Sequence, residues 1–290
     1  MMNRNDPRAP APGLALLAAS ALAVALLTGA APSAISHAVD VDWPAGVVTM
    51  RAGLDLYAAG IRLPAGRSEA ERSLAAAVPE LVMGTVLSLP LDSWRTVADA
   101  LDDGSLSPDT LREYLESGRR TALALSDDSR RLEGTWEWSL ARLGALFIRH
   151  SDPVDQKLPD RFVPTRAYSG IIIYAKGSYP VRGEHRPDSM VPCLYPRIYD
   201  SAMDPILERN LLDPEALAAW GSVGYAYSLE DPAVELRAGG DPLRIIVGEL
   251  FGSRRTDAVI AEADAMRILA SPENRELIRQ GRVVFLIDAP

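Results

Sequence analysis

The sequence predicts an α+β protein, with a small N-terminal strand-helix-strand module followed by a mixed-sheet domain with helices packed on it. In the second half, short apolar runs of strand length alternate with segments that carry helix start and stop signals. In the first half, helical segments lie between a short β-branched run and a run that alternates polar and aromatic residues. Residues 151–169 hold three prolines, several charges and no apolar period, which predicts a linker between the two parts.

The first 38 residues have the three parts of a secretion signal. Met1–Gly13 is net positive, Leu14–Leu27 is apolar and uncharged, and Ser36-His37-Ala38 places small residues before the bond to Val39. The apolar core is shorter than the roughly 20 residues that cross a bilayer. We therefore predict a signal peptide over residues 1–38, with an uncleaved N-terminal anchor and a buried helix as the alternatives. A lipid anchor would need a cysteine at the cleavage site, and none stands there.

The charge balance argues against two classes of partner. The formal net charge is −9, and the acidic and basic residues are mixed along the chain. Nucleic-acid binding needs a concentrated basic face, and attachment to an anionic membrane surface needs a polybasic patch. We therefore expect neither of these partners.

The N-terminal module is predicted over residues 39–150. Val47–Met50 is a β-branched run that predicts a first strand. Ser68–Val86 has an apolar stripe at helical spacing. Because an interior proline removes a backbone hydrogen bond and clashes with the preceding turn, Pro79 predicts a kink or a division of this helix.

Two further elements complete the predicted module. Ser107–Glu116 predicts a helix, because a serine can cap its start, a proline follows at the first helical position, and Gly118 lies just past its end. Gly134–Ser139 alternates polar and aromatic residues, as a half-buried strand does. Trp136 and Trp138 should therefore share one face of this strand.

The second domain is predicted over residues 170–290. Gly170–Ala175 is a continuous apolar run, as in a strand that is covered on both faces. Two helices are predicted at Asp213–Gly221 and Ser271–Gly281, since each has a capping residue, a proline, an acidic residue in the first turn and a closing glycine. The other predicted strands are Cys193–Tyr199, Ser222–Tyr227, Leu243–Val247, Asp257–Ile260 and Val283–Ile287.

No residue is assigned to catalysis, to a cofactor or to a metal. His150, Ser151 and Asp152 are the residue types of a hydrolase triad, but direct neighbours do not reach one another in triad geometry. We interpret them as the charged start of the linker. Gly239–Pro242 precedes a predicted strand rather than a helix, so we interpret it as a turn and not as a phosphate loop.

One polar cluster could carry chemistry. Glu184, His185 and Asp188 lie in the loop Gly177–Pro192 after a predicted strand, and Cys193 follows them. A thiolate with a histidine partner or a three-ligand zinc site can be imagined, but neither C-x-x-C nor H-E-x-x-H is present. We interpret the segment as a solvated loop, with a protein-contact loop as the alternative and a catalytic or metal site as the weakest hypothesis.

Cysteine and tryptophan are interpreted mainly as core residues. Cys193 is the single cysteine, so we expect a buried thiol, with pairing between two molecules as the alternative. The irregular spacing of the tryptophans favours core packing over a ligand cleft. These tryptophans are Trp43, Trp94, Trp136, Trp138 and Trp220.

Two stretches resemble known envelope proteins. Val41-Asp42-Trp43, Gly46 and the helix Ala70–Val82 resemble the N-terminal part of a family of small bacterial envelope lipoproteins, some of which serve in flagellar outer-membrane disc assembly. The second half is similar to a conserved region that is joined to that module in spirochaetes and other Gram-negative bacteria. The residues that carry this second likeness are Tyr168–Ala175, Tyr195–Asp200, Gly224–Ala226, Pro242-Leu243 and Arg282–Phe285.

The resemblance implies a non-enzymatic envelope protein and supplies no catalytic residues. Those relatives are anchored to lipid through an N-terminal cysteine, which this chain lacks. We therefore predict a periplasmic protein with a structural or assembly role through protein–protein contacts, flagellar assembly included. The expected partners are envelope or flagellar proteins or a second copy of the chain, with no membrane span after signal cleavage. The alternative is a periplasmic ligand-binding module that uses the cleft between the halves or loop 177–192, and a hydrolase using His185 or Cys193 is weaker.

Overall fold

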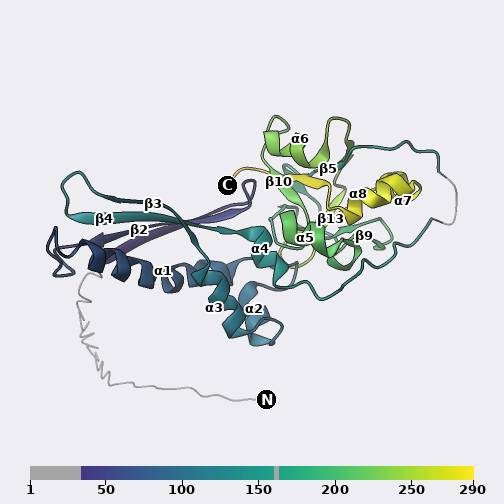
Figure 1. Cartoon of the computed structure of the whole chain (residues 1–290). Helices are drawn as coiled ribbons and strands as arrows, with labels where there is room; N and C mark the ends of the chain where they lie inside the picture. The colour runs from purple at the N-terminus through teal and green to yellow at the C-terminus, as the bar shows by residue number, and fades with distance from the viewer. Residues whose placement is uncertain (1–33, 160–162) are drawn as a thin grey trace, which may run out of the picture. The chain divides into compact units, whose positions relative to one another are not determined.

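The computed structural model describes residues 34–159 and 163–290 (Figure 1). Ala34–Pro290 form one compact unit, which combines helices, an N-terminal antiparallel sheet and a second part with further sheets. The predicted α+β class is therefore confirmed. The signal predicted over residues 1–38 falls outside the described residues except for its last five positions. No helix in the described ranges is long and apolar enough to cross a membrane.

The first half is built on a four-stranded antiparallel sheet in the order β1-β2-β4-β3. Its strands are β1 (Ile35–Asp42), β2 (Val47–Asp55), β3 (Arg119–Leu125) and β4 (Arg131–Ser139). In β4 the even-numbered residues from Leu132 to Trp138 are buried, so both tryptophans share the inner face as predicted. The strand predicted at Val47–Met50 is confirmed as the first part of β2, which continues to Asp55. It pairs with β1, a strand that we did not predict.

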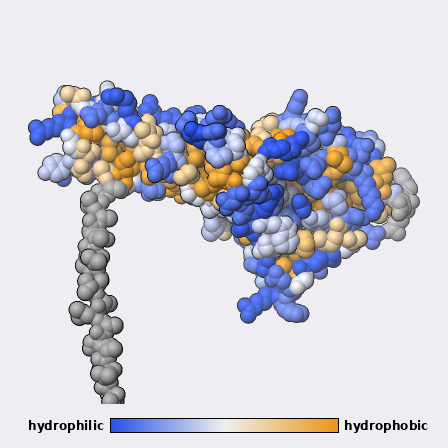
Figure 2. Space-filling view, turned by 90° about the horizontal axis from the view of Figure 1, so that it is seen from below, coloured by the Kyte–Doolittle hydropathy of each residue, from blue (hydrophilic) through white to orange (hydrophobic). Residues whose placement is uncertain are grey.

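Helix α1 (Arg67–Ser88) packs against this sheet. Its buried residues recur every four positions, from Ala70 through Leu74 and Val78 to Val86, so they form one face. Pro79 lies inside the helix, which continues past it, so the predicted division does not occur. The opposite side of α1 carries exposed Ala76 and Met83, and Figure 2 shows apolar patches among polar ones on the N-terminal half.

Three short helices complete the first half. They are α2 (Val97–Asp102), α3 (Pro108–Glu116) and α4 (Leu140–Ala145). The predicted cap of α3 is confirmed, because the Ser107 hydroxyl accepts a hydrogen bond from the amide of Thr110 at 3.1 Å. Helix α4 follows β4 without a loop, and the hydroxyl of Ser139 caps its start.

The second half holds a parallel sheet in the order β10-β14-β5-β11. Its strands are β5 (Ile171–Tyr174), β10 (Gly224–Ala226), β11 (Leu243–Ile246) and β14 (Val283–Leu286). All four overlap predicted strands. The central strands β5 and β14 are almost fully buried, which agrees with their continuous apolar sequences.

A second sheet has the order β12-β13-β8-β9 and mixes parallel and antiparallel pairs. Its strands are β8 (Ile198–Tyr199), β9 (Pro205–Leu207), β12 (Glu249–Phe251) and β13 (Asp257–Val259). A short pair, β6 (Ser178–Tyr179) and β7 (Asp188–Ser189), stands apart from both sheets. The strand predicted at Cys193–Tyr199 is reduced to its last two residues.

Three helices of the second half share one kind of start. Asp213, Asp231 and Ser271 cap α5 (Pro214–Trp220), α6 (Pro232–Ala238) and α8 (Pro272–Arg279), and each helix begins with proline. Gly221 and Gly239 end α5 and α6 with positive φ angles of 78° and 71°, a backbone region that glycine adopts at little cost. The remaining helices are η1 (Arg209–Leu211) and α7 (Glu262–Leu269).

Candidate binding cleft

The loop Pro90–Arg95 belongs to the first half and contacts the second half. Its carbonyls at Pro90 and Leu91 accept hydrogen bonds from the amides of Leu194 and Tyr195, at 3.0 and 2.9 Å. The carbonyl of Ser93 accepts from the hydroxyl of Ser253 at 2.6 Å. The loop is therefore held to the second half by its backbone as well as by side chains.

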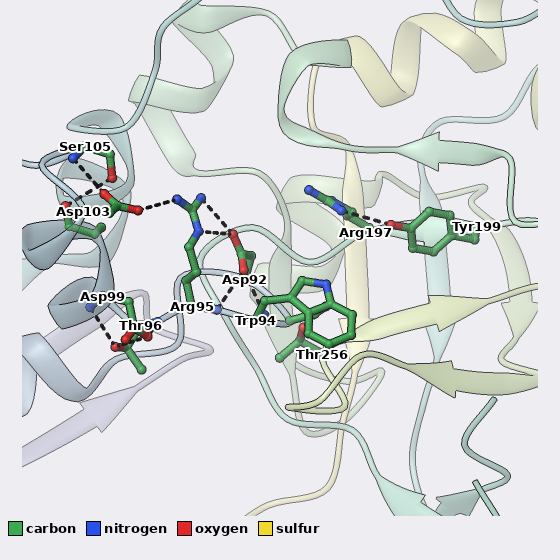
Figure 3. Close-up of polar contacts among 12 residues, drawn as sticks. Asp92, Trp94, Arg95, Thr96, Asp99, Asp103, Ser105, Arg197, Tyr199 and Thr256 are labelled. Atoms are coloured by element: carbon green, nitrogen blue, oxygen red, sulfur yellow. Dashed lines mark hydrogen bonds and ion pairs between the residues drawn. The ribbon is translucent and has the colours of Figure 1, made fainter. Parts of the chain in front are cut away.

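Asp92 and Arg95 hold this loop in shape (Figure 3). One Asp92 carboxylate oxygen accepts from the amides of Trp94 and Arg95, at 2.9 and 3.0 Å. The other accepts from the Arg95 guanidinium at 3.1 and 3.2 Å, and Arg95 also donates to Asp103 at 3.3 Å. Trp94, held at the tip, packs edge-to-face on Phe251 of β12.

Ser93 reaches a buried polar group in the second half. Its hydroxyl lies 2.8 Å from that of Thr256, and Thr256 donates to a carboxylate oxygen of Asp257 at 3.2 Å. The same oxygen accepts from the amide of Arg197 at 3.0 Å, whereas the second Asp257 oxygen is buried and has no hydrogen-bond partner among the described residues. Burial therefore raises the pKa of Asp257 above its ordinary value of 3.8, despite the hydrogen bonds that lower it.

We expect Asp257→Asn to change how stability depends on pH. Because the pKa of Asp257 is raised in the folded state, the folded wild type binds the carboxyl proton more tightly than the unfolded chain does. The stability that this proton binding contributes is lost as the pH rises from about 4 through the folded pKa. The variant lacks this loss, so its stability relative to wild type should increase by up to about 1.4 kcal/mol per pH unit in that window. Urea unfolding at several pH values measures the difference, and parallel profiles would contradict the assignment.

A cleft of about 420 Å³ lies where the two halves meet. From the first half it is lined by Trp43 in the β1–β2 turn and by the start of α4. From the second half it is lined by the end of α5, by β10 and by α6. This volume falls within the range of about 300–1,000 Å³ that is typical of ligand sites.

The walls of the cleft are fixed by contacts between the halves. Trp43 packs edge-to-face on Tyr225 of β10, with ring centroids 5.6 Å apart. The Tyr225 hydroxyl accepts from the amide of Cys193 at 3.0 Å and donates to its carbonyl at 2.8 Å. Tyr195 donates to the carbonyl of Gly144 in α4 at 2.7 Å. The cleft is therefore part of the packed structure, and it is bounded mainly by apolar side chains.

Arg237 of α6 is the charged residue of the cleft. Its guanidinium donates to the carbonyls of Trp220, Gly221 and Gly281, each at 2.8 Å, and it stacks on the Trp220 ring at 4.8 Å. These carbonyls lie at the ends of α5 and α8, where a cation is favoured. The side chain is 8% exposed, and burial lowers its pKa to about 9, so it is charged at neutral pH.

The structure separates the polar cluster predicted near residue 185. Glu184 and Asp188 both pair with Arg255, at 2.7 and 3.2 Å, and His185 is exposed beside them. Cys193 is buried elsewhere, at the cleft, and burial raises the pKa of its thiol. In the described ranges, no group of three or more histidine, cysteine or acidic residues could hold a metal ion.

The predicted linker residues form no triad geometry. The Nε2 atom of His150 lies 2.8 Å from the carbonyl oxygen of Leu212, and Ser151 donates to Asp152 at 2.8 Å. The tryptophans divide between three roles. Trp136 and Trp138 are core residues as predicted, whereas Trp43 and Trp220 line the cleft and Trp94 is exposed, with its ring edge-to-face on Phe251.

Two family models match this chain, one in each half. Residues 34–146 match the family model described as Treponema pallidum Tp0624, N-terminal domain. Residues 170–289 match the model described as Treponema pallidum Tp0624, second domain. The chain carries two spirochaete-type conserved regions. No curated protein matches it.

The two regions similar to Tp0624 together form the cleft. Trp43 and Gly144 belong to the first matched region, and Cys193, Trp220 and Arg237 belong to the second. We did not predict Arg237 or the residues of α4 that line the cleft. No local sequence pattern could have identified these residues, because the cleft forms only when the fold brings together segments that lie between Trp43 and Val284.

Proposed function

We propose that this chain is an exported envelope protein that acts by protein–protein contact, and that it binds a segment of its partner in the cleft between its halves. The observation that supports the proposal most is the cleft itself, which is apolar, of ligand size and bounded by both Tp0624-like regions. Leu236 of α6 lines the cleft and is 77% exposed, so an occupant of the cleft would cover an apolar side chain.

The proposed location is the periplasm, and the proposed partners are envelope proteins, flagellar ones among them, or a second copy of the chain. The signal pattern of residues 1–38 supports export. The flagellar link rests on the family resemblance alone. The exposed apolar residues of α1 are a second surface that such a partner could cover.

Site-specific crosslinking in cells tests the proposal. A photoreactive amino acid replaces Leu236 at the cleft, and in a matched strain it replaces Tyr57, which is 92% exposed and does not line the cleft. We expect a discrete adduct with position 236 and none with position 57, and mass spectrometry of the adduct identifies the partner. Adducts of equal strength at both positions, or none at either, would count against binding in the cleft.

If the chain is exported and its signal is cleaved, we expect the N-terminal residue of the mature protein to precede Ile35. Strand β1 begins at Ile35, and its pairing with β2 runs from Ile35 opposite Leu54. The carbonyl of Ala34 also accepts from the amide of Asp55 at 2.8 Å. Cleavage after Ala38, as the sequence pattern suggests, would remove half of this strand. Intact mass measurement of the exported protein checks this, and a chain that starts at Val39 would contradict it.

A further inference from the structure

Arg237 carries a positive charge without a carboxylate partner among the described residues. Its three hydrogen bonds go to backbone carbonyls, which are dipoles without net charge. An arginine has five N–H donors, so two remain after these bonds. The carbonyls at the two helix ends stabilise the cation, but they supply no full negative charge, so the side chain keeps a net positive charge that attracts an anion.

The surroundings of Arg237 define what kind of anion would fit. The cleft is lined by Trp43, Trp220, Tyr225 and Leu236, so most of an occupant must be apolar. An inorganic ion would leave these rings in contact with water. A single anionic group attached to an apolar body satisfies both the guanidinium and the walls.

We infer that the occupant of the cleft is the C-terminal end of a polypeptide, with its carboxylate on Arg237 and an apolar last side chain between Trp43 and Trp220. This inference rests on the proposed function, in which a partner segment fills the cleft. Capture of a chain end by its carboxylate is a recurrent mode of peptide recognition, and a planar guanidinium is suited to a carboxylate. It specifies the chemistry of the partner, which the proposed function leaves open.

Binding of short peptides to the purified protein tests the inference. The probes are acetyl-Ala-Leu-Phe with a free C-terminal carboxylate, the same peptide as the C-terminal amide, and decanoate as a carboxylate without a peptide. Tryptophan fluorescence follows the titration, because Trp43 and Trp220 line the cleft. We expect the free acid to bind at least tenfold more tightly than the amide and than decanoate.

A matched pair of variants at Leu236 provides the control without changing Arg237. Leu236 is exposed, so neither Leu236→Asp nor Leu236→Arg should change the melting temperature of the protein. The aspartate places a negative charge at the cleft and should weaken binding of the acid peptide at least threefold. The arginine places a positive charge there and should strengthen binding of the acid peptide. The amide peptide should respond less to the sign of the new charge.

The outcomes separate the inference from the proposed function. If the amide binds as well as the acid, or if no probe binds, recognition of a chain end is wrong, whereas crosslinking from position 236 still decides whether a partner uses the cleft. If decanoate binds more tightly than the peptide acid, the occupant is an aliphatic carboxylate and the peptide assignment fails. If the acid peptide binds and no adduct forms in cells, the selectivity of the cleft for a chain end is shown, and the proposal that a partner occupies the cleft in cells fails.

Discussion

Replacing Gly252 with alanine should destabilise the protein by about 2–5 kcal/mol. Gly252 has a φ of 90°, a region that residues with a side chain rarely adopt. An added Cβ would also lie 2.4 Å from the Cβ of Ser93, which is far inside van der Waals contact. Ser93 has little freedom to move, because its hydroxyl and its carbonyl are both engaged with the second half. Denaturant unfolding measures the loss.

Gly177 is a matched control for this substitution. Its φ of 93° is nearly the same, but an added Cβ would meet nothing within 4 Å. Gly177→Ala should therefore cost only the backbone strain, about 1–2 kcal/mol. The Ser93→Gly and Gly252→Ala double variant should recover part of the additional loss, since the two sites are in contact. Equal losses at Gly252 and Gly177 would show that the contact with Ser93 contributes nothing.

Elements with a strong local signal could be predicted from the sequence. The caps and closing glycines of α5 and α8 are confirmed, because a capping side chain, a proline and a glycine act within one turn and need no tertiary context. Asp231-Pro232 and Gly239 carry the same signal, and they bound α6, which we did not predict. That omission was a failure to apply a signal which the sequence contains.

Other elements depend on contacts that a local pattern does not contain. Strand β1 begins inside the predicted signal, where small residues were interpreted as a cleavage site rather than as a strand. Strand β3 begins with the exposed residues Arg119-Arg120, and it forms because its backbone pairs with β4. An edge strand needs little apolar sequence, because only its pairing partner determines it.

The cleft could not be predicted for the same reason. In the sequence, Arg237 is one of many basic residues, and no spacing sets it apart. Its burial results from the approach of three segments, the end of α5, strand β10 and the turn at Gly281. The tryptophans were interpreted as core because their spacing is irregular, and the fold brings Trp43 and Trp220 to one cleft from positions far apart in the chain.

Arg237→Met should destabilise the protein by about 3 kcal/mol or more. The substitution keeps an unbranched side chain but leaves the carbonyls of Trp220, Gly221 and Gly281 without their donor. Each unsatisfied buried acceptor costs about 1–3 kcal/mol. Removing the desolvated guanidinium offsets part of this loss, since burial of the charge is itself unfavourable. The three lost bonds should outweigh this gain, because Arg237 links α6 to both the loop after α5 and the turn after α8.

Arg244→Met on β11 is the matched control, because Arg244 is exposed and the same charge and side chain are exchanged. It should change stability by less than about 0.5 kcal/mol. Denaturant unfolding of both variants gives the comparison, and near-equal stabilities would show that Arg237 is not needed for the fold. That result would strengthen its assignment to ligand binding, since a buried charge that does not stabilise the protein is retained for another purpose. A large loss would instead show that Arg237 holds the carbonyls at two helix ends, and its role toward a ligand would then be decided by the peptide titrations alone.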